Sequence, residues 1–179
     1  MNILVFDTST NILYATLGDE KGIVDTRIIP STEQNYNSAF LISTIVDILK
    51  KSDLQSDDIS AIGVNIGPGS FTGLRAAITT ARVMGQQLNI PVFGTASLQV
   101  YSMLNKTDRK SLCIMDARRG KAYVSIYAQD NEPILEPCAI EYDKAIEICK
   151  EEDYFIISDD RMVKTLSENG LEYIKIQEF

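Results

Sequence analysis

The sequence contains no histidine among its 179 residues. Without histidine, Ser-His-Asp and Cys-His triads cannot form, and histidine-based zinc sites and acid-base catalysis are excluded. Cysteine is scarce as well, because only Cys113, Cys138 and Cys149 occur and no pair has the Cys-x-x-Cys spacing. This odd number favours buried thiols in a reducing compartment over a disulfide framework or a metal clamp.

Long apolar runs and a basic leader are also missing. The start Met1-Asn2-Ile3-Leu4 has no positively charged region, and no apolar stretch approaches the roughly 18 residues of a membrane helix. We therefore expect a cytoplasmic chain that is neither secreted nor inserted into a membrane. With 10 Gly, 5 Pro and 45% hydrophobic residues, its composition is typical of one large or two small globular domains.

Basic residues are outnumbered, since 17 Lys+Arg stand against 25 Asp+Glu and give a net charge of -8. Such an acidic chain is not expected to bind nucleic acid alone, because phosphate binding needs a concentrated basic surface. Residues 1–128 carry 12 basic and 11 acidic side chains, whereas residues 129–179 carry 5 and 14. The asymmetry, without any internal repeat, indicates two folded parts or a folded part with an acidic appendage.

The first half of the chain predicts strands alternating with helices. Strands are expected at residues 3–6, 12–17, 23–29, 59–66 and 91–93, and helices at 33–50, at 71–88 and from Ser97, the expected cap of the third helix. Three antiparallel strands followed by crossover helices imply a mixed α/β sheet with helices on both faces. That is the layout of actin-like and ribonuclease H-like domains.

A second set of elements begins at Ser111. Strands are expected at residues 112–115, 124–127, 154–157 and 173–176, and helices at 144–151 and 162–169. The polar run 105–110 suggests a boundary. We therefore predict an N-terminal lobe at 1–104 and a smaller α/β lobe at 105–179.

A glycine-rich motif, Gly67-Pro68-Gly69-Ser70-Phe71-Thr72-Gly73-Leu74-Arg75, lies between a predicted strand and a predicted helix. It matches neither a P-loop nor a dinucleotide fingerprint. Free amides at such a helix start can hold an anion. The other interpretation is a tight turn in which Ser70 caps the helix.

Two predicted helices have surfaces that fit either the chain's own core or a partner. Helix 71–88 carries a small-residue stripe whose members are Gly73, Ala77, Ala81 and Gly85. This stripe packs either on the chain's own sheet or against a partner helix. Helix 33–50 has an apolar arc that is wider than one buried face needs, formed by Ala39, Leu41, Ile42, Ile45, Val46, Ile48 and Leu49. The excess is covered by the second lobe or by another chain.

Carboxylates follow two predicted strands, at Asp7 and Asp116. Carboxylates at strand ends hold magnesium or Mg-ATP in ribonuclease H-like and actin-like enzymes. A two-metal site needs three or four carboxylates, however, and only Asp159 or Asp160 is available to join. We therefore favour a turn-capping role for each Asp.

Six basic residues within 106–121 indicate a solvated loop face or contact with an acidic partner.

Three separated stretches resemble the bacterial TsaB (YeaZ) family. They are Phe6-Asp7-Thr8-Ser9-Thr10, residues 62–97 with the glycine motif, and Asp116-Ala117-Arg118-Arg119-Gly120-Lys121-Ala122-Tyr123. Two departures stand beside these matches. Asn37-Ser38 replaces a pair that often begins with His in the family. The chain also ends at Phe179, before the final helical segment and basic tail of many relatives, so a shortened second lobe is expected.

The resemblance implies an actin-like (ASKHA) fold and a non-catalytic subunit of the complex that forms N6-threonylcarbamoyladenosine at adenosine 37 of tRNAs reading ANN codons. In that family the subunit pairs with catalytic TsaD through its N-terminal helices, an ATPase called TsaE joins, and homodimers form without TsaD. TsaD holds its metal with His residues, which this chain lacks. We expect tRNA to be bound only through the complex, and ATP or ADP with magnesium only at the junction with the partners.

These inferences give two sets of candidate residues and no catalytic or metal-ligating residue. The expected partner interface consists of Asn37, Phe40, Leu41, Ile42, Ile45, Thr72, Gly73, Arg75, Ala76, Ala77, Thr80 and Arg82. The candidate anion or nucleotide loop consists of Asp7, Thr8, Ser9, Gly67, Gly69 and Ser70. The alternative is an actin-like ATP-dependent phosphotransferase or nucleotide hydrolase that uses this loop. Against it, the second lobe lacks a Gly-rich phosphate loop.

Overall fold

The computed structural model describes residues 1–32 and 36–176. The chain divides into two compact units, Met1–Ser97 and Leu98–Phe179. This division falls after the first residue of helix α3 (Ser97–Ser102), whereas the sequence suggested a boundary after residue 104. The reason is that Leu98 and Tyr101 of α3 are buried in one cluster with side chains of the second unit.

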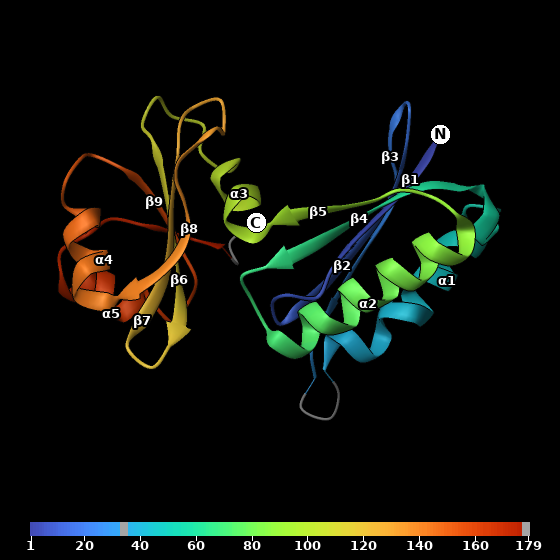
Figure 1. Ribbon diagram of the computed structural model, residues 1–179, viewed down its shortest axis with the longest axis horizontal. Helices are drawn as coiled ribbons and strands as arrows, with labels where there is room; N and C mark the ends of the chain where they lie inside the picture. Colours follow the sequence, from blue (N-terminus) through green and yellow to red (C-terminus); the bar gives the residue numbers. More distant parts are fainter. Residues whose placement is uncertain (33–35, 177–179) are drawn as a thin grey trace. The chain divides into compact units, whose positions relative to one another are not determined.

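The first unit is built on a five-stranded mixed sheet with the order β3-β2-β1-β4-β5 (Figure 1). Its strands are β1 (Asn2–Asp7), β2 (Ile12–Asp19), β3 (Gly22–Pro30), β4 (Ile59–Gly67) and β5 (Val92–Ala96). β1, β2 and β3 pair antiparallel, while β4 is parallel to β1 and to β5. Short polar breaks favour the two hairpins, and the helical connections make the later strands parallel.

Helices α1 (Leu41–Lys51) and α2 (Phe71–Leu88) cover the same face of this sheet (Figure 1). Their buried side chains join those of β1, β2 and β4 in one core. The predicted helix 33–50 begins instead as a 3-10 turn, η1 (Asn37–Phe40), and its residues 33–35 lie outside the described residues. A second 3-10 turn, η2 (Ser56–Asp58), precedes β4.

The second unit repeats the topology of the first. Its sheet has the order β10-β9-β6-β7-β8, which is the same pattern of three antiparallel strands followed by two parallel ones. The elements are β6 (Ser111–Arg118), β7 (Lys121–Tyr127), β8 (Pro133–Glu141), α4 (Tyr142–Cys149), β9 (Phe155–Ser158), α5 (Val163–Glu168) and β10 (Ile174–Lys175). The mixed α/β class predicted from the sequence is confirmed in both units.

Helices cover both faces of the second sheet, with α4 and α5 contributing to one buried cluster and α3 to another. The prediction of helices on both faces is therefore right for this sheet. It is wrong for the first sheet within the described residues, because both long helices of that unit share one core. Across the described parts of the chain, no helix is long and apolar enough to cross a membrane.

The sequence missed strand β8, for a physical reason. It contains Pro133 and Pro137, and it forms an edge of its sheet. Proline cannot donate to a ladder hydrogen bond, so it is tolerated only at edges and bulges. The β7–β8 register shifts between Val124 and Ile126, opposite Pro137, and so accommodates the missing donor.

Candidate functional site

The glycine motif after β4 lies directly against the turn that follows β1. A Cβ added at Gly73 would lie 1.8 Å from the Thr8 carbonyl oxygen, so only glycine fits there. The Thr8 hydroxyl donates to the Gly73 carbonyl at 2.7 Å, and the Ser70 amide donates to the Ser9 carbonyl at 2.6 Å. The six candidate loop residues are therefore brought together in the first unit.

Asn65 at the end of β4 joins these two turns, although the sequence analysis did not select it. Its side-chain NH2 donates to Asp7 Oδ2 at 2.7 Å and to Ser9 Oγ at 3.2 Å. Its carbonyl oxygen accepts from the Gly67 amide at 2.8 Å and from the Ser97 hydroxyl at 2.9 Å. A buried amide inside an apolar strand was the signal in the sequence, since such groups require hydrogen-bond partners.

Ser97 belongs to this network rather than to a helix cap. Its hydroxyl can donate to two acceptors, the Pro68 carbonyl oxygen at 2.7 Å and Asn65 Oδ1 at 2.9 Å. The prediction that Ser97 caps the third helix is therefore wrong, since the hydroxyl points back to the glycine motif. The predicted cap at Ser70 is confirmed, because its side chain accepts from the Gly73 amide.

Whether the candidate loop can bind an anion depends on how many backbone amides at the start of α2 are free to donate. Ser70 and Leu74 donate their amides to carbonyls within the chain, and the Gly73 amide donates to the Ser70 hydroxyl. Thr8 and Ser9 are buried, whereas Gly69 and Ser70 are exposed. The loop is thus a hydrogen-bonded turn in which several amide donors already have partners, and this turn joins two strands to a helix.

Asp7 and Asp116 occupy equivalent positions, at or near the ends of β1 and β6, and both cap turns as expected. Asp7 Oδ1 accepts from the Ser9 amide at 2.6 Å, and Asp116 Oδ1 accepts from the Arg118 amide at 2.7 Å. Asp159 also reaches the second site, since its carboxylate accepts from the Asp116 amide. Among the described residues, no group of three or more His, Cys, Asp or Glu is arranged to hold a metal ion.

The surroundings of Asp116 connect three elements of the second unit. Tyr142 at the start of α4 donates its hydroxyl to Asp116 Oδ1 at 2.7 Å. The guanidinium of Arg161 lies 3.7 Å from the other carboxylate oxygen. Burial, together with the nearby Asp116 charge, raises the pKa of Asp159, while hydrogen bonds from backbone amides oppose that shift. Asp116 is thus a structural junction within this unit.

The candidate interface residues separate into two groups. Five are buried within the first unit, namely Asn37, Leu41, Ile45, Gly73 and Ala77. They present no side-chain surface to a partner, because they form the chain's own core and turn. The small-residue stripe of α2 therefore packs on its own sheet, and its assignment to a partner contact is corrected. Asn37 supports a turn, since its side chain donates to the Thr10 carbonyl at 3.1 Å.

The other candidates form an outward surface of η1, α1 and α2. Ile42 is 58% exposed, and Thr72, Arg75 and Arg82 are exposed. Phe40, Ala76 and Thr80 are half-buried. Val46, which the sequence analysis placed in the wide apolar arc, is exposed as well, and so are Phe71 and Val83, which it did not propose for an interface. We define these ten residues as the helical surface.

The basic residues of 106–121 lie mostly at loops and hairpins of the second unit. Several pair with acids, including Arg109 with Asp153 at 3.1 Å and Lys110 with Glu152 at 2.6 Å. Because these basic residues share a unit with the acidic segment, residues 98–179 carry 11 Lys+Arg against 16 Asp+Glu, a net charge of -5. The second unit is therefore less acidic than residues 129–179 alone, whose net charge is -9.

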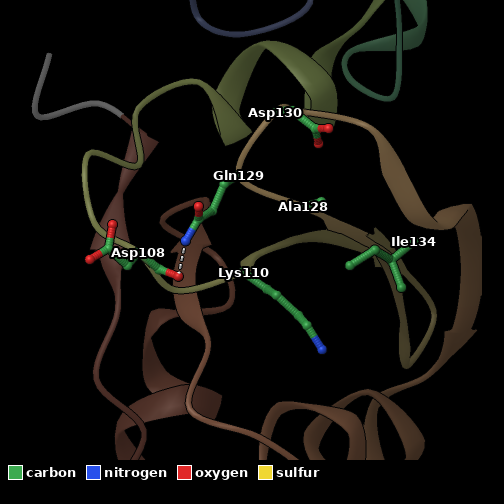
Figure 2. Close-up of a pocket in the computed structure, with 6 residues that line it drawn as sticks. All are labelled: Asp108, Lys110, Ala128, Gln129, Asp130 and Ile134. Carbon is green, nitrogen blue, oxygen red and sulfur yellow. Dashed lines mark hydrogen bonds between the residues drawn. The ribbon is translucent and has the colours of Figure 1, made fainter.

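A hollow in the second unit, shown in Figure 2, contains none of the predicted site residues. It is lined by Asp108, Lys110, Ala128, Gln129, Asp130 and Ile134. The Gln129 side chain donates to the Asp108 carbonyl (Figure 2), and Lys110 is paired with Glu152. Its lining therefore consists mainly of groups that already interact within the chain.

We expect Asn65→Asp to lower the free energy of unfolding by about 3 kcal/mol at pH 7, because it places a carboxylate against Asp7 and removes a donor. The loss should shrink in acid, where the new carboxyl becomes protonated. Urea unfolding at pH 7 and pH 4 measures both effects. Ser97→Ala, which removes one hydroxyl, should cost about 1 kcal/mol. Equal stability of Asn65→Asp and the unmodified chain at pH 7 would contradict the network's role.

The hydrogen bond of Tyr142 makes the stability of the chain depend on pH in the alkaline range. This bond to Asp116, aided by burial, raises the pKa of Tyr142 from 10.0 to about 12. This group's contribution to stability is therefore complete below pH 10 and lost as the pH rises toward 12. Tyr142→Phe should be less stable by about 1 kcal/mol at pH 8, and the difference should narrow at pH 11.5. Tyr36→Phe, at an exposed tyrosine, is the control, and a pH-independent difference would contradict the assignment.

Comparison with known proteins supports the resemblance found in the sequence. A family model described as "TsaD: tRNA N6-adenosine threonylcarbamoyltransferase" matches residues 23–168. The TsaB protein of Bacillus subtilis (strain 168), named a tRNA threonylcarbamoyladenosine biosynthesis protein, is 29% identical over 178 residues, covering 96% of this chain and 77% of the relative. The Escherichia coli (strain K12) TsaB is 30% identical over 139 residues, covering 75% and 58%. The match thus spans less than two thirds of the E. coli relative.

The fold is also that of a solved relative. YeaZ from Pseudomonas aeruginosa superposes with a TM-score of 0.75 at 20% identity, covering 94% of this chain and 79% of that one. At this identity the likeness establishes the fold. The family model covers most of the chain and the curated relatives match on both sides of the glycine motif, so the chain belongs to the TsaB (YeaZ) family.

Proposed function

We propose that this chain is a non-catalytic subunit in the formation of N6-threonylcarbamoyladenosine in tRNA, and that it docks onto a TsaD-like catalytic subunit through the helical surface. The observation that carries the proposal is the set of apolar side chains that α1 and α2 leave in solvent, with Ile42, Phe71 and Val83 each more than half exposed. Exposed apolar groups gathered on two neighbouring helices are typical of a protein contact.

The composition of the helical surface supports docking rather than catalysis. Arg75 lies over the Phe71 ring at 5.4 Å from its centroid, so one cation and one aromatic ring form a preorganised pair. Aromatic and arginine side chains are enriched in interfaces, and a few of them usually dominate the binding energy. The surface contains no carboxylate, thiol or imidazole that could act as an acid, base or nucleophile.

Two further features support a non-catalytic role. The chain has no histidine, whereas the resemblance gives the catalytic paralogue a histidine-bound metal. Neither unit is basic, since residues 1–97 carry 6 Lys+Arg against 9 Asp+Glu and the second unit is acidic as well. We therefore propose that the partners provide most of the tRNA contact. A TsaE-like ATPase joins the pair in the cytoplasm, and a homodimer forms through the same surface when TsaD is absent.

Docking predicts that Ile42→Asp weakens association with the TsaD-like subunit of the same organism by about 30-fold or more, which corresponds to about 2 kcal/mol. Calorimetric titration gives the affinity, and size-exclusion chromatography gives the assembly state. Ile28→Asp is the matched control, because Ile28 of β3 is 61% exposed but lies outside the helical surface. If Ile42→Asp and Ile28→Asp both bind like the unmodified chain, the docking proposal is wrong.

We propose in addition that the isolated chain holds no nucleotide, and that ATP or ADP with magnesium binds only where the partners meet it. The internal hydrogen bonds at the start of α2 support this part of the proposal. Titration of the chain alone with Mg-ATP should give no saturable heat. Tight binding by the chain alone, lost in Asp7→Asn, would instead support the actin-like phosphotransferase.

A further inference from the structure

The turn between β6 and β7 has an unusual backbone for its sequence. Arg118, Arg119 and Gly120 have φ values of 64°, 55° and 78°. Two-residue hairpin loops with positive φ at both positions normally carry Asn-Gly or Asp-Gly, because those residues tolerate the left-handed region. Here Arg119 takes the first loop position and Gly120 the second, while Arg118 is the last residue of β6, pairs with Lys121 and lies beside a register shift. Arginine at a positive φ is less favourable than glycine or asparagine. We define Arg118 and Arg119 as the arginine tip.

Hydrogen bonds to Asp116 and Tyr142 hold the arginine tip in this conformation. Asp116 Oδ1 accepts from the Arg118 amide at 2.7 Å and from the Tyr142 hydroxyl at 2.7 Å. The Tyr142 amide donates to the Gly120 carbonyl at 2.9 Å. These bonds attach both sides of the turn to the start of α4. A strained backbone persists when the surrounding structure fixes it, and such residues cluster at functional positions.

The charges of the tip are not neutralised within the second unit. Both side chains are exposed, and among residues 1–32 and 36–176 neither guanidinium makes an ion pair or hydrogen bond. Their neighbours behave differently, since Lys121 pairs with Glu141 at 3.3 Å and Arg161 approaches Asp116. In a unit with an excess of acids, the fold thus presents two unpaired guanidinium groups on a rigid turn.

We propose that the arginine tip is a second docking site, which binds a pair of carboxylates on a protein partner. A guanidinium matches a carboxylate through two parallel hydrogen bonds, and a fixed backbone lowers the entropy cost of forming them. An extended RNA strand fits less well, because it requires a broad basic surface and the unit carries a net charge of -5. This inference rests on the proposed function, that the chain is a subunit of a complex.

The tip belongs to the second unit, whereas the helical surface belongs to the first. The two contacts therefore involve separate residues and can be removed independently. Arg118→Gly/Arg119→Gly removes both guanidinium groups, relieves the positive-φ positions and keeps the Arg118 amide that Asp116 binds. We expect this variant to melt at a higher temperature than the unmodified chain, yet to bind its partner at least tenfold more weakly.

The test is calorimetric titration of the full chain with the TsaD-like subunit and with the TsaE-like ATPase of the same organism, at low and at physiological salt. Arg118→Glu/Arg119→Glu should weaken binding to at least one of the two proteins by more than tenfold, and most at low salt. Lys144→Glu/Lys150→Glu changes the charge equally at exposed positions of the same unit and should bind normally.

The outcomes separate this inference from the proposed function. Unchanged affinity of both tip variants for both proteins overturns the tip contact, whatever Ile42→Asp does. Normal protein binding combined with loss of tRNA in a gel-shift assay also overturns it, in favour of RNA. If the unmodified chain binds neither protein, both proposals fail. If tip variants lose a partner while Ile42→Asp does not, the tip contact stands and the helical docking fails.

Discussion

The first unit depends on the close backbone contact between Thr8 and Gly73. The two chain segments meet with no room for a Cβ, and Asn65 bonds to both of the turns involved. This contact fixes where α2 begins and which side of it faces the sheet. Its small residues then lie inward, and Val83, Arg75 and Arg82 are left outside. A local steric requirement thus determines which side chains of α2 remain exposed.

The second unit has the same strand order but uses its equivalent turn differently. Both first strands carry an aspartate at or near their end that accepts a hydrogen bond from the amide two residues later. In the first unit this turn is buried against a helix, whereas in the second it leads into an exposed hairpin. One topology therefore supports an apolar helical surface in one unit and a charged turn in the other. Such division of labour is consistent with a subunit whose role is to contact other molecules.

Much of the fold was predictable from hydrophobic periodicity and turn residues, because buried strands such as β1 and β4 and the long helix α2 have strong patterns. Strand β8 was not, since its prolines interrupt the pattern. The helical surface was predictable only in part, because periodicity identifies an apolar face but not which members the chain's own sheet will cover, as Ile42 and Ile45 demonstrate. The position of Asn65 in an apolar strand indicated an amide that needs hydrogen-bond partners, but the identity of those partners was not predictable, because Asp7 lies 58 positions away.

The prolines of β8 also influence how copies of this protein can aggregate. An edge strand with free amides is a template on which another chain can extend the sheet. Pro133 and Pro137 lie in the β8 edge strand, and the register shift opposite Pro137 makes this strand irregular. Prolines and bulges in an edge strand both disfavour pairing with another chain. Uncontrolled strand addition at this edge is thereby discouraged. At this edge the second unit is therefore protected from growing into a continuous sheet with further copies of the chain.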